Sequence, residues 1–163
     1  MIYLAQPYSS PDREIRQSRF LKGMAVASLL LSQGEHVYSP ITHWHVASET
    51  FSLPGNFAFW QEHNFYMLDR SSAIYCLLLE GWPASKGLRG ELEHWINSHG
   101  GKKPVNLFTV SLLELPYNSE LRRVELPTIR VSPVQDAFAL MRYFNGQDTA
   151  EPGTDAGSNG APH

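Results

Sequence analysis

The stretch AIYCLLLEGWPASKGLRGELEHW (residues 73–95) passes from an apolar run through a loop into a helix. Residues 73–79 are continuously apolar, which is typical of a parallel strand buried on both faces of a sheet. Residues 81–87 are rich in glycine, proline and serine, and a helix is predicted from about Ser85 to the Gly100-Gly101 pair. In open parallel α/β sheets, ligands bind at such junctions, beyond the carboxyl ends of the strands.

Strands and helices alternate on both sides of this stretch. The other strands are predicted at residues 2–5, 36–40, 105–110 and 128–132. The other helices are predicted from a Ser10-Pro11-Asp12 cap to about Gln33, over about residues 57–70 after an Asn56 cap, and over residues 133–144. Alternation of this kind requires βαβ crossovers, so we expect an α/β fold with three layers and a mostly parallel sheet.

The length of 163 residues is normal for one domain, which we expect to span residues 1–144. The remainder, residues 145–163 (NGQDTAEPGTDAGSNGAPH), has no aliphatic residue larger than alanine. Such a segment buries too little apolar surface to fold, and it is predicted to be a disordered C-terminal tail.

The composition of the chain argues against two classes of binding partner, nucleic-acid polymers and membranes. A formal net charge of −3 argues against binding to a nucleic-acid polymer, which favours a basic surface. No apolar run approaches the roughly 18 residues of a membrane span, and the N-terminus lacks signal-peptide features. We therefore expect a cytoplasmic protein with no membrane partner.

Metals and cofactors are not expected either. Cys76 is the single cysteine, which excludes disulfides and thiolate metal clusters within the chain. His43 and His45 stand two residues apart without an evident third ligand, which is a weak metal signal.

The two glutamates of the 85–99 helix are separated by helical geometry. At about 100° per residue, Glu91 lies about 60° from Leu88, at the border of the apolar face, whereas Glu93 points to solvent. A carboxylate at this border and near a helix N-terminus is expected to stay ionised, which suits a nucleophile better than a proton donor. The alternative is that Glu91 only stabilises the first turns of its own helix.

Two further polar residues have a structural and a functional interpretation. Asn64 falls on the apolar stripe of the 57–70 helix, where it is expected either to bond a backbone group or to face a ligand. Arg13 lies at the start of the first helix, either on a solvated face or beside a substrate phosphate.

Four blocks together resemble the nucleoside 2-deoxyribosyltransferase-like superfamily. They are MIYLAQPYS (1–9), VYSPITHWH (37–45), FW…N…FYMLDR (59–70) and GWPASKGLRGELE (81–93), and they occur in the family's order over about residues 1–110. They are most similar to a branch of short bacterial and phage proteins of unknown function. The resemblance implies a flavodoxin/Rossmann-like three-layer sandwich and cleavage of an N-glycosidic bond.

The resemblance also implies roles for individual residues. Glu91 matches the family's nucleophile, which attacks the anomeric carbon of the sugar and forms a glycosyl-enzyme ester. Tyr3 and Tyr8 match elements that contact the base and the nucleophile. Ser85 matches a loop serine that contacts the 5′-phosphate in members that cleave nucleotides.

Asn64 departs from the family pattern, because an aspartate that assists the leaving base usually stands at this position. An amide can hold a hydroxyl or a ring nitrogen but cannot shuttle a proton. Three explanations stay open: an engineered substitution that traps an intermediate, a natural member with a changed substrate or mechanism, or a protein that kept only binding.

The leading hypothesis is an N-glycosidase acting on (deoxy)nucleoside 5′-monophosphates, with Glu91, Asn64 and Tyr3 as its catalytic group. Candidate substrate-binding residues are Gln6, Tyr8, Ser9, Ser10, Arg13, Ser39, His43, Trp60, Ser85 and Gly87. The alternatives are a nucleoside deoxyribosyltransferase that exchanges bases and a nucleotide-binding sensor or inhibitor without turnover. A homodimer or higher homo-oligomer is expected, because relatives assemble through helices that complete one another's active sites.

Overall fold

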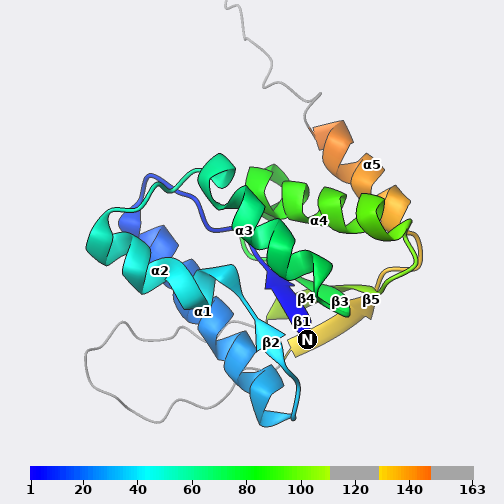
Figure 1. Cartoon of the computed structure of the whole chain (residues 1–163), viewed down its shortest axis with the longest axis horizontal. Helices are drawn as coiled ribbons and strands as arrows, with labels where there is room; N and C mark the ends of the chain where they lie inside the picture. Colours follow the sequence, from blue (N-terminus) through cyan, green and yellow to red (C-terminus); the bar gives the residue numbers. More distant parts are fainter. Residues whose placement is uncertain (111–128, 148–163) are drawn as a thin grey trace, which may run out of the picture.

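The computed structural model describes residues 1–110 and 129–147 and has the α/β architecture expected from the sequence (Figure 1). The strands are β1 (Ile2–Ala5), β2 (Val37–Tyr38), β3 (Ala73–Leu77), β4 (Val105–Val110) and β5 (Ile129–Pro133). The helices are α1 (Arg13–Ser32), α2 (Pro40–Phe51), α3 (Phe57–Asp69), α4 (Lys86–His99) and α5 (Ala137–Gln147), with a short 3₁₀ turn, η1, at Trp82–Ala84.

The sheet order is β2-β1-β3-β4-β5. The first four strands are parallel, and β5 pairs antiparallel with β4. Side chains of β1 alternate between the two faces: Tyr3 and Ala5 join a core with α3, α4 and α5, whereas Leu4 packs with Val26 and Leu30 of α1. Helices therefore cover both faces, which confirms the three-layer sandwich with a mostly parallel sheet.

Three helix caps follow directly from the sequence. Asn56 accepts a hydrogen bond from the Phe59 N–H, and Ser85 accepts one from the Leu88 N–H. Gly100 ends α4 in the left-handed conformation, with φ of 58°. The Asn56 and Ser85 caps fix where α3 and α4 begin, and both helix starts lie at the carboxyl edge of the sheet.

Several predicted boundaries are wrong. The cap of α1 is Asp12, whose side chain accepts from the Glu14 N–H, so the helix begins later than Ser10. The second strand is shorter than predicted because Ser39 caps a helix that the sequence prediction left as a loop, and Pro40 is its first residue. That helix is α2.

The C-terminal elements are also displaced from their predicted positions. Pro133 is the last residue of β5, and α5 begins only at Ala137, where Asp136 accepts a hydrogen bond from the Ala139 N–H. The helix continues to Gln147, so a tail can begin no earlier than residue 148. Residues 148–163 lie outside the described residues, as does the segment 111–128. No helix in the described ranges combines the length and apolarity needed to cross a lipid bilayer.

Helices α3 and α4 lie side by side (Figure 1). The Phe57 ring of α3 packs closely against Gly90 of α4. A Cβ added at Gly90 would lie 2.6 Å from two ring atoms of Phe57. We expect Gly90→Ala to lower the free energy of unfolding by about 1–3 kcal/mol, because the ring has to move. Denaturant titration measures this loss.

Gly87→Ala is the matched control, because its added Cβ would lie 3.7 Å from Phe57, an ordinary contact. Alanine is also the better helix former by about 1 kcal/mol, so this variant should be neutral or stabilised. Equal stability of the two variants would contradict the predicted close packing.

Candidate active site

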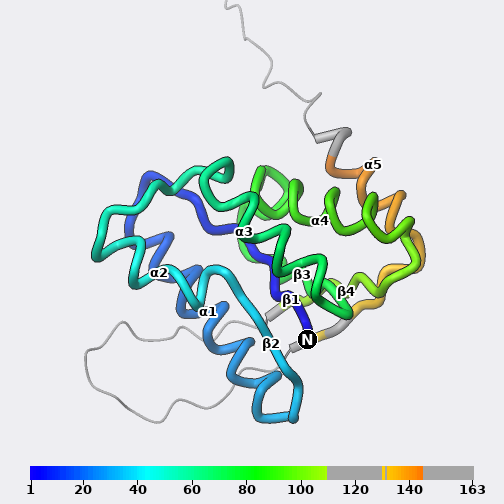
Figure 2. Tube along the Cα trace, viewed as in Figure 1, coloured from blue at the N-terminus to red at the C-terminus, as the bar shows by residue number. Residues whose placement is uncertain are grey.

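A cavity of about 720 Å³ opens at the carboxyl edge of the sheet, where the sequence predicted a ligand site. The tube in Figure 2 shows the loop between β1 and α1 running beside the connection between α2 and α3, and Ser9 Oγ donates a hydrogen bond to the Gly55 carbonyl at 3.3 Å. The lining residues come from that loop, from α1, α2 and α3, and from the β3–α4 junction. The cavity is therefore built from three of the chain's connections, β1–α1, α2–α3 and β3–α4, together with the adjoining helices.

Glu91 is buried in α4, with only 6% of its surface exposed, and it lines the cavity. Its Oε1 accepts two hydrogen bonds of 2.8 Å, one from the Tyr3 hydroxyl and one from Asn64 Nδ2. Its Oε2 accepts none from the described residues. One carboxylate oxygen is thus fixed, and the other remains available for chemistry.

Burial raises the pKa of Glu91 from 4.5 to about 7, although the hydrogen bonds from Tyr3 and Asn64 oppose that rise. The position of Glu91 near a helix N-terminus predicts an ionised carboxylate, but loss of hydration is the stronger effect at this depth. Near neutral pH the group therefore exists in both protonation states, and its ionised form is a poorly solvated, reactive carboxylate.

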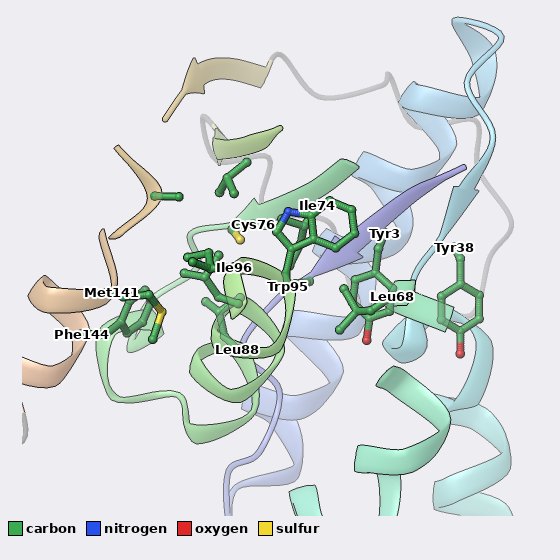
Figure 3. Close-up of a cluster of buried hydrophobic side chains, with 14 residues drawn as sticks. Tyr3, Tyr38, Leu68, Ile74, Cys76, Leu88, Trp95, Ile96, Met141 and Phe144 are labelled. Carbon is green, nitrogen blue, oxygen red and sulfur yellow. The ribbon is translucent and has the colours of Figure 1, made fainter. Parts of the chain in front are cut away.

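Tyr3 contributes from β1, where it is fully buried. Figure 3 shows the Tyr3 and Tyr38 hydroxyls pointing in the same direction. Tyr3 is not among the cavity-lining residues. It holds Glu91 in position from the sheet side and does not face the cavity. Burial and the adjacent Glu91 raise the pKa of Tyr3, so it stays a hydrogen-bond donor.

Removing this donor has a predictable effect on Glu91. A hydrogen bond to a charged group contributes about 1.5–3 kcal/mol, so Tyr3→Phe should raise the pKa of Glu91 by about 1–2 pH units. Carbon-13 NMR titration of labelled glutamate carboxyls measures this value without any substrate. Tyr75→Phe is the control, because Tyr75 stacks on Phe108 away from Glu91. An unchanged Glu91 titration in Tyr3→Phe would contradict the proposed hydrogen bond.

Asn64 lies in α3 with 4% of its surface exposed, and it lines the cavity. The structural alternative considered for it, a bond to a backbone group, is wrong, because its amide donates to Glu91. Its Oδ1 is buried and accepts no hydrogen bond within the described part of the chain. The amide has the donor geometry of a protonated aspartate but no proton to transfer.

Part of the cavity wall is rich in hydrogen-bond donors. Ser85, Lys86 and Gly87 of the α4 N-terminus line it, and the helix dipole there favours an anion. Arg19 of α1 also lines the cavity. Its guanidinium donates to the Ser9 carbonyl at 2.9 Å and to the Glu80 carbonyl at 2.8 Å, which ties the β1–α1 loop to the β3–α4 loop.

Arg13 does not take the role that the sequence suggested for it. Its side chain is 79% exposed, and its Nε lies 3.7 Å from Glu49 Oε2, outside the cavity. Ser10 is also outside, where its Oγ accepts from the Asp12 N–H. Arg13 is the first residue of α1, as expected, but Arg19 is the arginine of this helix that reaches the cavity.

Another part of the cavity wall is mainly apolar and aromatic. Trp44 of α2 and Trp60 of α3 lie there with ring centroids 6.1 Å apart. The face of α2 that lines the cavity consists of Pro40, Ile41, Trp44, His45 and Ser48. These α2 residues were not predicted as ligand residues, because α2 itself was not predicted; Trp60 of α3 was. Ser39-Pro40 nevertheless has the same cap-and-proline pattern used to predict other helix starts.

The histidine pair of α2 divides between surface and cavity. His43 is exposed and hydrogen-bonds the Ser39 carbonyl, and neither His43 nor Ser39 lines the cavity. His45 is buried and does line it. The described residues contain no group of three His, Cys, Asp or Glu side chains placed to hold a metal ion.

The cavity brings together most of the predicted residues. Those that line it are Glu91, Asn64, Gln6, Tyr8, Ser9, Trp60, Ser85 and Gly87. Together they define a three-layer α/β protein whose cavity is lined by one buried carboxylate, by a helix N-terminus and by two tryptophans.

The chain belongs to the family described as a domain of unknown function (DUF1937), which matches residues 1–109. This range covers β1 to β4 and includes every cavity-lining residue. A search of curated proteins found no match.

Proposed function

We propose that the protein cleaves the N-glycosidic bond of (deoxy)nucleoside 5′-monophosphates and releases the free base. In this reaction Glu91 Oε2 attacks the anomeric carbon, the bond from that carbon to the base nitrogen breaks, and a glycosyl ester forms on Glu91. Water then hydrolyses the ester and restores the carboxylate.

The observation that carries this proposal is the asymmetry of the Glu91 carboxylate. Tyr3 and Asn64 both donate to Oε1, so the carboxylate plane is held, while Oε2 receives no hydrogen bond from the part of the chain that the structure describes. A carboxylate with a purely structural role would be expected to have both oxygens bonded, because burial of an unpaired charged group is costly.

Two groups of lining residues support a nucleotide as the substrate. The α4 N-terminus and the nearby Arg19 and Lys86 suit a phosphate, while Trp44 and Trp60 suit a planar base. Glu91 and Asn64 line the cavity as well, and in this arrangement the sugar would be the part that meets the carboxylate.

A nucleotide-binding protein without turnover is the second candidate, and Asn64 is the observation that favours it. Base exchange between nucleosides remains a further alternative for the same covalent ester, with a second base taking the place of water. The cytoplasmic location and the homo-oligomer also remain predictions from the sequence.

The test is incubation of the full chain with a panel of nucleosides and their 5′-monophosphates, followed by chromatography for free base. The proposal predicts release from a monophosphate and much slower release from the matching nucleoside. Release that requires an added acceptor base would favour the transferase. Binding without release, read from ligand-induced thermal stabilisation, would replace the proposal with the non-catalytic candidate.

A further inference from the structure

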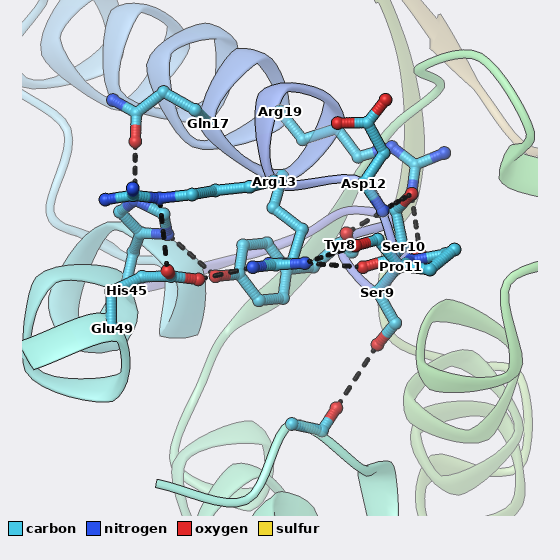
Figure 4. A network of polar contacts seen from close by, with 12 residues as sticks. Tyr8, Ser9, Ser10, Pro11, Asp12, Arg13, Gln17, Arg19, His45 and Glu49 are labelled. Carbon is cyan, nitrogen blue, oxygen red and sulfur yellow. Dashed lines mark hydrogen bonds and ion pairs between the residues drawn. The ribbon is translucent and has the colours of Figure 1, made fainter. Parts of the chain in front are cut away.

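His45 has both ring nitrogens engaged inside the cavity wall. The Tyr8 hydroxyl lies 2.7 Å from its Nδ1, and Gln17 Oε1 lies 2.9 Å from its Nε2 (Figure 4). A glutamine oxygen only accepts, so Nε2 carries the proton and the neutral ring accepts the Tyr8 O–H at Nδ1. Phe20 stacks on the ring with centroids 4.2 Å apart, which fixes its plane.

Protonation of His45 would reverse one of these hydrogen bonds. With both nitrogens protonated, Nδ1–H donates to the Tyr8 oxygen, and the Tyr8 proton is then released from His45. Both Tyr8 and His45 line the cavity that holds Glu91. When His45 is protonated, the Tyr8 hydroxyl is therefore free to donate its proton to a ligand in the cavity.

The charged groups around the pair come from α1 and α2. Burial lowers the pKa of His45, Glu49 of α2 opposes that effect, and Arg16 and Arg13 of α1 add to it. The resulting imidazolium is a stronger acid than an exposed one. Burial also raises the pKa of Tyr8, but this does not impede transfer, because the phenolate need not form if His45 replaces the proton that Tyr8 gives away.

The leaving base needs such a proton from somewhere. Apart from Glu91, the titratable side chains among the described lining residues are Tyr8, Arg19, His45 and Lys86. Of these, only an imidazole ordinarily titrates near neutral pH, and Asn64 has no proton to transfer.

We propose that His45, acting through Tyr8, supplies the proton to the departing base in this protein. This inference rests on the proposed function. As the bond from the anomeric carbon to the base nitrogen breaks, its electron pair stays on the base, and a base nitrogen or oxygen takes the Tyr8 proton. The proton on His45 Nδ1 moves to the Tyr8 oxygen, which leaves His45 neutral, and solvent protonates it again before the next turnover.

The test compares two leaving groups of the same sugar 5′-phosphate. One is the natural base that the panel identifies. The other is a base that is already cationic and leaves without a proton: N7-methylguanine for a purine-cleaving enzyme, or nicotinamide for a pyrimidine-cleaving one. His45→Gln keeps a hydrogen-bonding side chain but cannot be protonated. His94→Gln is the control, because His94 pairs with Asp69 away from the cavity.

We expect His45→Gln to lower kcat for the natural base by about 10²–10⁴-fold, the usual contribution of a general acid, and to change kcat for the cationic base by less than about fivefold. Wild-type kcat/KM for the natural base should also fall on the alkaline side as His45 loses its proton, and this fall should be absent for the cationic base. If His45→Gln does not fold, Tyr8→Phe should show the same selectivity between leaving groups.

Equal losses on both leaving groups, or no loss on the natural base, would overturn the assignment of His45 while leaving glycosidic cleavage intact. A wild-type protein that cleaves neither substrate would overturn the proposed function itself. The two failures are therefore distinguishable in one set of assays.

Discussion

Glu91→Gln is expected to abolish release of free base, with kcat reduced by at least about 10³-fold. Glutamine can still accept the Tyr3 and Asn64 hydrogen bonds through its amide oxygen, so the shape of the cavity is kept. The amide nitrogen then occupies the position of Oε2 and cannot form the ester. The measurement is the single-turnover rate of base release with the substrate that the panel identifies.

Glu93→Gln is the matched control, because Glu93 lies two residues away on the same helix but is exposed. It should retain wild-type kcat. Comparable activity of wild-type protein and Glu91→Gln would remove Glu91 from the mechanism.

The same substitution should stabilise the fold above neutral pH. The Glu91 carboxyl has a pKa of about 7 in the folded protein against 4.5 as its ordinary value, so between these pH values the folded state binds more protons than the unfolded state. The free energy of unfolding of the wild type should therefore be highest below pH 4.5 and should fall as pH rises through about 7. A pKa difference of this size corresponds to about 3 kcal/mol.

Glu91→Gln lacks this proton linkage. Urea denaturation at several pH values should show the variant and the wild type nearly equal at about pH 4, and the variant more stable by about 3 kcal/mol at about pH 8. Glu93→Gln, measured in parallel, corrects for changes in net charge. A wild-type protein as stable as Glu91→Gln at pH 8 would mean that the buried carboxylate does not carry the cost inferred for it.

The layered architecture was predictable because apolar strands and capped helices leave local signals. The run at residues 73–79 and the Ser85 cap placed the junction that holds Glu91, and the position of Glu91 on the border of an apolar face predicted its burial beside the sheet. The raised pKa of Glu91 was not predictable from the sequence, because it depends on how deeply the folded chain buries the carboxyl group.

The parts of the site that sequence reasoning missed depend on elements whose starts were misjudged. The sequence pattern places Ser39 in a strand, whereas it caps α2. Without that helix, Trp44 is not predicted to line the cavity. Arg13 is the first residue of α1 and its side chain is exposed, whereas Arg19, further along the same helix, lines the cavity. The pairing of Tyr8 with His45 joins residues far apart in sequence, and no local pattern predicts it.

The covalent intermediate is the most direct test of the account. The full chain would be mixed with the cleaved monophosphate, quenched in acid within milliseconds to seconds, and examined by intact-protein and peptide mass spectrometry. The account predicts a pentosyl-phosphate adduct on the peptide containing Glu91, present in the wild type and in Glu93→Gln and absent in Glu91→Gln. Free base produced with no adduct at any time, or an adduct that persists in Glu91→Gln, would contradict nucleophilic attack by Glu91.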